Sequence, residues 1–202
     1  YIALEASGAL FTGTIDNVSV REINPLSVSI AMDGRMTYAD TDTAVSFDGR
    51  SGEVVPYSWR EGTTAFVSAQ MATSSTSTGR MFFIQRDSVA SDVVFTAEDY
   101  YSPDILVPFD IAGRYGSTFI NGATEGVALT VNTTPTSLSD LSATDLDLAY
   151  DYMGTIGTFR VWDKDLGDTG IVEATNPSLE PSLSLTFEGT GTNSFVVNNW
   201  AE

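Results

Sequence analysis

The 202-residue sequence contains neither cysteine nor histidine, and Lys164 is its only lysine. Without cysteine the chain has no disulfide framework and no thiolate nucleophile, and without histidine it has no imidazole base. With both missing, the usual zinc sites are excluded. Basic residues are few, since 9 Lys and Arg stand against 27 Asp and Glu, which gives a formal net charge of -18. Such an acidic surface repels phosphate groups, so we expect no nucleic-acid partner.

Long hydrophobic runs are also missing. No apolar run approaches the ~20 residues that span a bilayer, so we expect no membrane insertion. Hydrophobic residues still make up 42% of the chain, which is enough for a core. Ser, Thr, Gly and β-branched residues dominate, and Leu/Glu/Lys-rich helical stretches are absent. Short alternating segments with turn signals every ~8–12 residues predict an all-β fold, an antiparallel β-sandwich of the jelly-roll type.

Three segments carry sharper structural predictions. LSVSIAM (26–32) alternates apolar and polar residues and is expected to end at a turn formed by Asp33-Gly34. RMFFIQR (80–86) is apolar at consecutive positions, which predicts a strand that is buried on both faces. Asn121-Gly122 is the sequence signature of a type I′ turn and predicts the tip of a central hairpin.

A candidate calcium site lies in WDKDLGD (162–168). Asp163, Asp165 and Asp168 come close together around a glycine, and calcium takes carboxylate oxygens from flexible loops. The spacing does not follow the EF-hand pattern. The alternative, which we favour, is that Asp168 caps a helical turn at about Asp168–Ala174 while the other two carboxylates are solvated.

Tyrosines that flank loop signals are candidates for binding a glycan. The faces of sugar rings pack on aromatic side chains, and nearby polar groups then fix the orientation. Tyr100 and Tyr101 lie between turn signals, and Tyr57 lies in a short predicted strand. Trp59 and Trp162 alternate with apolar neighbours and are expected in the core. Tyrosine is also common at protein interfaces, so both interpretations of Tyr100 and Tyr101 stay open.

Arg114 is a further binding candidate because it stands in an acidic chain at the Arg-Tyr-Gly end of a predicted strand. A guanidinium binds an acidic sugar or a partner's carboxylate in a bidentate manner. An intramolecular ion pair is the simpler interpretation, and we favour it.

The sequence offers no convincing catalytic pair. A β-sandwich glycosidase needs two carboxylates about 5–10 Å apart across a cleft. Glu98 and Asp99 are adjacent and would point to opposite faces of a strand, whereas Asp145 and Asp147 alternate with leucine as the solvated side of a sheet does. Since histidine is missing as well, we expect a protein that is not an enzyme.

GTIGTFRVWDKDLGDTGIVEAT (154–175) resembles the closing motif of concanavalin A-like, laminin-G-type jelly rolls. In that motif a strand of the form G-x-I-x-x-[FV]-[RK]-[VIL]-[WY] leads into a short acidic helical turn. The matching positions are Gly154, Ile156, Phe159, Arg160, Val161, Trp162, Leu166 and Asp168. The resemblance implies a laminin-G-like jelly roll over residues 25–176 and leaves 177–202 as a C-terminal β extension.

LFTGTIDNVSVREI (10–23) is similar to the last strand of carbohydrate-binding-module jelly rolls, so residues 1–24 are expected to be a terminal strand or the tail of an upstream β module. Chains that combine both elements resemble fibre and spike proteins of bacteriophages and phage-derived particles. That resemblance implies a virion-surface, extracellular structural protein, a head or tail fibre, spike or decoration protein. It would form a homo-oligomer and bind other virion proteins, host-cell glycans, or both. The alternative is a carbohydrate-binding module of a secreted polysaccharide-degrading enzyme or of a bacterial adhesin.

Overall fold

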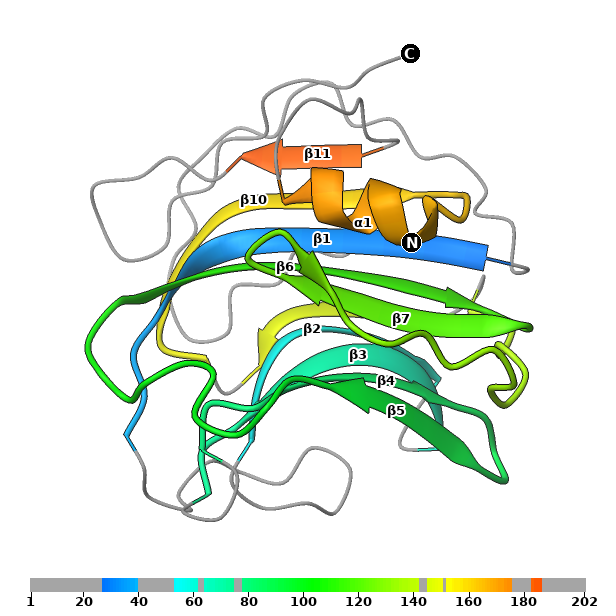
Figure 1. The fold of residues 1–202 in the computed structure, drawn as a ribbon, viewed down its shortest axis with the longest axis horizontal. Coiled ribbons are helices and arrows are strands. Elements are labelled where there is room, and N and C mark those ends of the chain that lie inside the picture. The colour runs from blue at the N-terminus through cyan, green and yellow to red at the C-terminus, as the bar shows by residue number, and fades with distance from the viewer. Residues whose placement is uncertain are drawn as a thin grey trace.

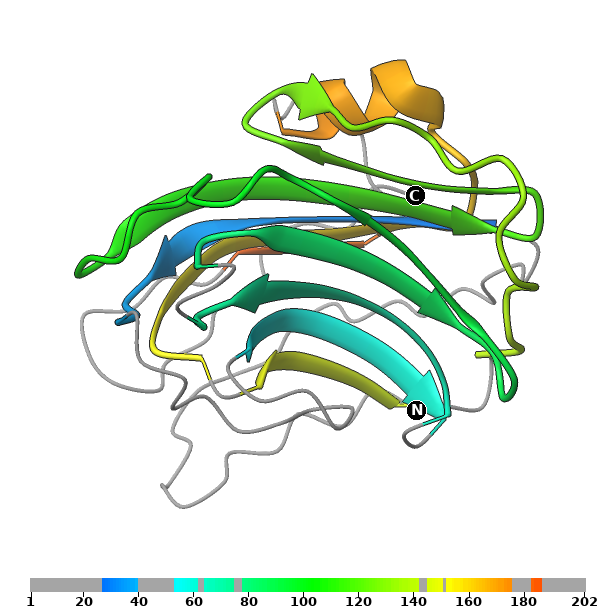
Figure 2. The same ribbon diagram turned by 60° about the horizontal axis from the view of Figure 1, so that its bottom comes forward.

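The protein folds into two antiparallel sheets stacked face to face, with one short helix on the outside (Figures 1 and 2). This computed structural model describes residues 27–39, 53–61, 64–74, 78–141, 145–150, 152–175 and 183–186. The expected antiparallel β-sandwich is therefore confirmed. The predicted tail at 1–24 lies outside the described residues, as does the C-terminal extension apart from the strand at 183–186.

The first sheet has six strands in the order β11-β10-β1-β6-β7-β8. Their bounds are β1 Ser27–Met36, β6 Val107–Gly116, β7 Phe119–Thr124, β8 Val127–Ala128, β10 Gly154–Trp162 and β11 Leu183–Thr186. The long strand β1 lies between β10 and β6 and pairs with both. This sheet places segments from the two ends of the described chain side by side.

The second sheet has five strands in the order β5-β4-β3-β2-β9. Their bounds are β2 Glu53–Glu61, β3 Ala65–Ala72, β4 Met81–Arg86, β5 Ser91–Phe95 and β9 Asp145–Tyr150. Within β4 both Phe83 and Ile84 are fully buried although they point to opposite faces, so the prediction that 80–86 is buried on both sides is confirmed.

The main core lies between the sheets and contains two buried tyrosines. The hydroxyl of Tyr57 from β2 lies 3.0 Å from that of Tyr115 in β6, and the Tyr115 hydroxyl donates to the backbone oxygen of Ser68 at 3.0 Å. Gln85 of β4 forms a second link between the sheets, because its amide both donates to the oxygen of Gly116 and accepts from its backbone N–H. Buried polar groups with satisfied hydrogen bonds fix how the two sheets are aligned.

The helix α1 (Gly167–Ala174) packs on the outer face of the six-stranded sheet (Figure 2). Small residues make room for it: Ala31, Ala112 and Ala123 of β1, β6 and β7 form a buried cluster with Ile171 of the helix and Trp162 of β10. At the far end of the helix the Arg160 guanidinium donates to the oxygen of Ala174 at 2.8 Å. In the described part of the chain no helix is long and apolar enough to cross a membrane.

The prediction of a turn at Asp33-Gly34 is wrong, because β1 runs through this dipeptide to Met36. The register of β1 against β10 shifts between Met32 and Gly34, which is a β-bulge. An Asp33 carboxylate oxygen accepts the backbone N–H of Thr158, and a Cβ on Gly34 would lie 2.3 Å from the oxygen of Thr155. Asp33-Gly34 therefore allows β1 and β10 to lie close together at the bulge.

The prediction that Asn121-Gly122 forms a hairpin turn is also wrong. The β6–β7 hairpin exists, but its turn lies at residues 117–118, and Asn121-Gly122 lies inside β7. Glycine is needed at 122 because a Cβ there would lie 2.0 Å from the ring of Phe83. Positive φ at both central residues, which a type I′ turn requires, occurs instead at Glu125 and Gly126, between β7 and β8.

We expect Gly122→Ala to lower the free energy of unfolding by about 1–3 kcal/mol, because the added methyl overpacks the core against Phe83. Urea denaturation measures this loss, with the exposed Ser117→Ala in the same hairpin as the control. In a Phe83→Leu background the penalty of Gly122→Ala should shrink. A full penalty in both backgrounds would show that the Phe83 contact is not its cause.

Candidate functional site

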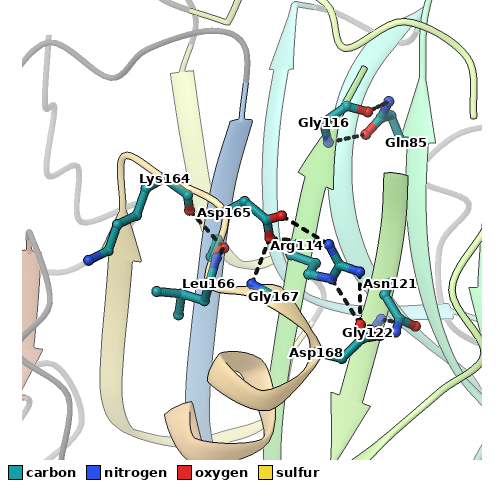
Figure 3. A network of polar contacts seen from close by, with 11 residues as sticks. Gln85, Arg114, Gly116, Asn121, Gly122, Lys164, Asp165, Leu166, Gly167 and Asp168 are labelled. Carbon is teal, nitrogen blue, oxygen red and sulfur yellow. Dashed lines mark hydrogen bonds and ion pairs between the residues drawn. The ribbon is translucent and has the colours of Figure 1, made fainter. Parts of the chain in front are cut away.

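Arg114 binds two carboxylates on the outer face of the six-stranded sheet (Figure 3). Its Nη1 lies 3.1 Å from Asp165 Oδ2, and its Nη2 lies 2.9 Å from Asp168 Oδ1. Asn121 donates to the same Asp168 oxygen at 2.6 Å. The guanidinium also lies over the ring of Phe119, 4.6 Å from its centroid. The favoured interpretation of Arg114 as an intramolecular ion pair is confirmed.

This arrangement changes the interpretation of the acidic segment. Asp168 does not cap the helix: α1 begins at Gly167, and the N-cap position is Leu166, whose side chain makes no capping bond. An Asp165 oxygen instead accepts the backbone N–H of Gly167 at 2.8 Å. No three acidic side chains are placed to hold a metal ion in the described residues, which include Asp163. The positive charge beside Asp165 and Asp168 is that of Arg114, so the segment attaches the helix to the sheet.

We expect Arg114→Met to lower the free energy of unfolding by about 2 kcal/mol, because it removes charged hydrogen bonds from Asp165 and Asp168. Urea denaturation measures the loss, and hydrogen exchange should show faster exchange in α1. Arg35→Met is the matched control, since Arg35 is exposed and makes one side-chain bond to the oxygen of Leu106. Equal effects of the two substitutions would contradict a specific role for the Arg114 cluster.

The three candidate tyrosines lie in different environments. Tyr57 is 0% exposed, so its interpretation as a glycan-binding residue is wrong: its ring lies in the core and faces no solvent. Tyr101 is 5% exposed, and its hydroxyl donates to Glu125 Oε1 at 2.9 Å. Tyr100 is 38% exposed, and its hydroxyl donates to the oxygen of Thr124 at 3.2 Å. The two neighbouring rings meet edge to face, with centroids 5.1 Å apart, so Tyr101 supports the Tyr100 ring from below the surface.

Three carboxylates lie in a row next to the loop that carries Tyr100 and Tyr101, and the Tyr101 hydroxyl joins the loop to this row at Glu125. Asp33 of β1 is directly paired with Asp110 of β6. Two hydrogen bonds hold Glu125 next to Asp110: the Glu125 backbone N–H donates to the Asp110 backbone oxygen at 2.9 Å, and the Asp110 backbone N–H donates to Glu125 Oε1 at 2.9 Å. We call Tyr100, Asp33, Asp110 and Glu125 the Tyr100 surface. It lies at the end of the sandwich where residues 96–106 connect β5 to β6, at the left of Figure 1.

The carboxyl of Asp110 is the most perturbed acid of this row. Burial, together with the charges of Asp33 and Glu125, raises its pKa from an ordinary value of 3.8 to about 7, although the positive charge of Arg160 acts in the opposite direction. Like charges on directly opposite residues of neighbouring strands destabilise a sheet. A proton on Asp110 relieves that repulsion.

The backbone around the Tyr100 surface is strained. Among the described residues, positive φ without glycine occurs at Asp99 (54°), Leu106 (54°), Glu125 (50°) and Ala149 (59°). Asp99 and Leu106 belong to the same connection as Tyr100, and Glu125 belongs to the surface itself. Such conformations are costly and concentrate at functional sites. The sequence made Tyr100 a candidate, which stays a prediction, but it did not single out Asp33, Asp110 or Glu125; for Glu125 the available signal was the Glu125-Gly126 turn dipeptide.

We expect Asp110→Asn to change how stability depends on pH. Since the folded state holds the Asp110 proton up to about pH 7 and the unfolded state releases it near 3.8, the native protein should lose stability as pH rises through that window. The substitution should flatten the decline. Urea unfolding of both proteins at pH values from about 4 to about 8 measures the difference, which isolates Asp110 from the other carboxylates. Parallel curves would contradict the assignment.

No protein-family model and no curated protein matches the sequence. Solved structures match the fold. The CBM40 domain of the Ruminococcus gnavus IT-sialidase, bound to α2,6 sialyllactose, superimposes with a TM-score of 0.53 and 12% identity over 74% of this chain and 83% of that one. The fold is a concanavalin A-like jelly roll. The botulinum neurotoxin serotype D binding domain gives 0.52 and 12% over 83% and 40% of the two chains. A heptameric SAP-like pentraxin from Limulus polyphemus gives 0.50 and 8% over 88% and 77%.

Proposed function

We propose that the chain is a non-enzymatic glycan-binding domain and that the Tyr100 surface contacts the sugar. The observation that carries the proposal is the partly exposed ring of Tyr100, whose hydroxyl is bonded to the backbone oxygen of Thr124, the residue before Glu125. The Glu125 carboxylate accepts from the Tyr101 hydroxyl and from the backbone N–H of Asp110. The ring offers an apolar face for a sugar, and carboxylate oxygens accept hydrogen bonds from its hydroxyl groups. The strained backbone on both sides of Tyr100 fixes this geometry before a ligand arrives.

The fold and its structural neighbours support this proposal. The R. gnavus domain was solved with sialyllactose, and the neurotoxin neighbour is named as a binding domain. The sequence of this chain itself has no histidine and offers no convincing pair of carboxylates for catalysis. Binding without catalysis is therefore the function that this fold and surface support best.

We further propose that the domain is displayed on the surface of a phage or phage-like particle as a homo-oligomeric fibre, spike or decoration protein. The support is the combination of a laminin-G-like motif at 154–175 with a carbohydrate-binding-module-like strand at 10–23, a pairing that resembles such proteins, together with a net charge of -18 that suits an exposed, soluble surface. Light scattering of the purified chain tests the oligomer, and binding to other particle proteins tests the location. A monomer with no affinity for them would overturn this assignment.

The second candidate is a carbohydrate-binding module of a secreted polysaccharide-degrading enzyme, or of a bacterial adhesin. It is favoured by the same surface, because both roles require glycan binding. The gene's coding sequence upstream of Tyr1 distinguishes the candidates: a glycosidase motif supports the enzyme, tandem copies of this domain support the adhesin, and fibre or capsid-anchoring sequence supports the particle.

We expect Tyr100→Ala to weaken binding to the preferred glycan at least tenfold, because the stacking ring is lost, which corresponds to about 1.4 kcal/mol. Tyr100→Phe keeps the ring and should retain most of the affinity. A glycan array identifies the ligand, and isothermal titration calorimetry measures both variants, with circular dichroism confirming that they fold. Unchanged affinity of Tyr100→Ala would exclude this surface.

A further inference from the structure

We infer that the Tyr100 surface selects uncharged, hydroxyl-rich glycans and rejects sialylated ones, an inference that rests on the proposed glycan-binding function. It separates this chain from its structural neighbour, the R. gnavus domain that was solved with sialyllactose. The two share a fold at 12% identity, so the neighbour's ligand does not carry over. The charges of this chain's own surface decide the ligand class.

The first argument is the sign of the charges that surround Tyr100. Asp33, Asp110 and Glu125 form a continuous row across β1, β6 and the turn after β7. Glu125 is exposed, and Asp110 and Asp33 are half-buried. The Tyr100 hydroxyl is bonded to Thr124, the residue before Glu125, so a sugar that stacks on Tyr100 would meet this row first at Glu125. Carboxylate oxygens accept hydroxyl protons but repel a sugar carboxylate.

The second argument is that each arginine in the described ranges already has at least one partner within the chain, so an incoming sugar carboxylate would compete with that contact. A bidentate guanidinium is the usual protein partner of a carboxylate. Within the described ranges the arginine side chains contact other parts of the chain, as hydrogen bonds or ion pairs at Arg35, Arg60, Arg80, Arg114 and Arg160, and over the ring of Phe66 at Arg86. Arg160, whose positive charge acts to lower the pKa of Asp110, donates to the oxygen of Ala174.

The third argument is that the rejection of sialylated glycans should depend on pH, because Asp110 can take up a proton. Asp110 faces Asp33 from β1, Glu125 from the β7–β8 turn, Arg160 from β10 and Tyr101 from the loop. When Asp110 takes up a proton, the row loses one negative charge and gains a hydroxyl donor. Rejection of an anionic sugar should therefore weaken as the pH falls below neutral, whereas binding of an uncharged sugar changes less.

The test uses matched pairs of glycans that differ only in a terminal sialic acid, beginning with lactose and α2,6 sialyllactose and extending to an array of such pairs. Calorimetry at low salt should give at least tenfold weaker binding for the sialylated member. Glu125→Gln should reduce that ratio severalfold, because the amide oxygen still accepts from Tyr101 while the charge is gone. Glu173→Gln removes one exposed carboxylate from α1 and should leave the ratio unchanged.

Each result distinguishes failure of the charge selection from failure of the proposed glycan binding. Equal or tighter binding of sialylated glycans by the natural chain would overturn the charge selection and leave glycan binding intact. No binding of any pair would overturn glycan binding itself, and the selection with it. Should Glu125→Gln fail to fold, salt replaces it: at about 1 M the Debye length falls to about 3 Å, so the ratio must shrink in the natural chain. A ratio indifferent to salt would refute charge as its cause.

Discussion

The ring of Phe83 sets how closely the two sheets approach each other. It lies over a floor made by two glycines, Gly113 and Gly122, which face each other on β6 and β7. A Cβ on either glycine would come within 3.0 Å of that ring. Near these glycines, the Tyr57 and Tyr115 hydroxyls and the Gln85 amide make their hydrogen bonds across the core. The alignment of the two sheets therefore depends on Gly113 and Gly122 having no side chain.

The two faces of the six-stranded sheet differ in composition and in what packs against them. The inner face carries large apolar side chains into the core, whereas the outer face is built from small and charged residues. Alanines leave space for α1 over one half of that outer face. The other half carries Asp33 and Asp110, which would not be tolerated in the core but can face a ligand or water. One strand pattern therefore supports both the packing of α1 and the proposed binding surface.

The sequence predicted this architecture well where the pattern of apolar residues was the signal, as in the continuous apolar run at 80–86 and in the strand before the acidic turn. It failed at Asp33-Gly34 and Asn121-Gly122, because glycine is required there by close atoms of neighbouring elements and not by a positive φ. Crowding is a long-range property: nothing local to Gly122 reveals that Phe83 will lie above it. For the same reason Tyr100 could be proposed, whereas its carboxylate neighbours Asp33 and Asp110 could not, since register alone brings them together.

The helix α1 is fastened at both ends by arginines from strands that do not touch each other. Arg114 on β6 holds the carboxylates at its start, and Arg160 on β10 holds the carbonyl at its end. β1 lies between those two strands. The helix therefore acts as a diagonal brace across three strands, and sliding β6 along β10 would stretch contacts at both of its ends. A domain built in this way resists shear along its strands.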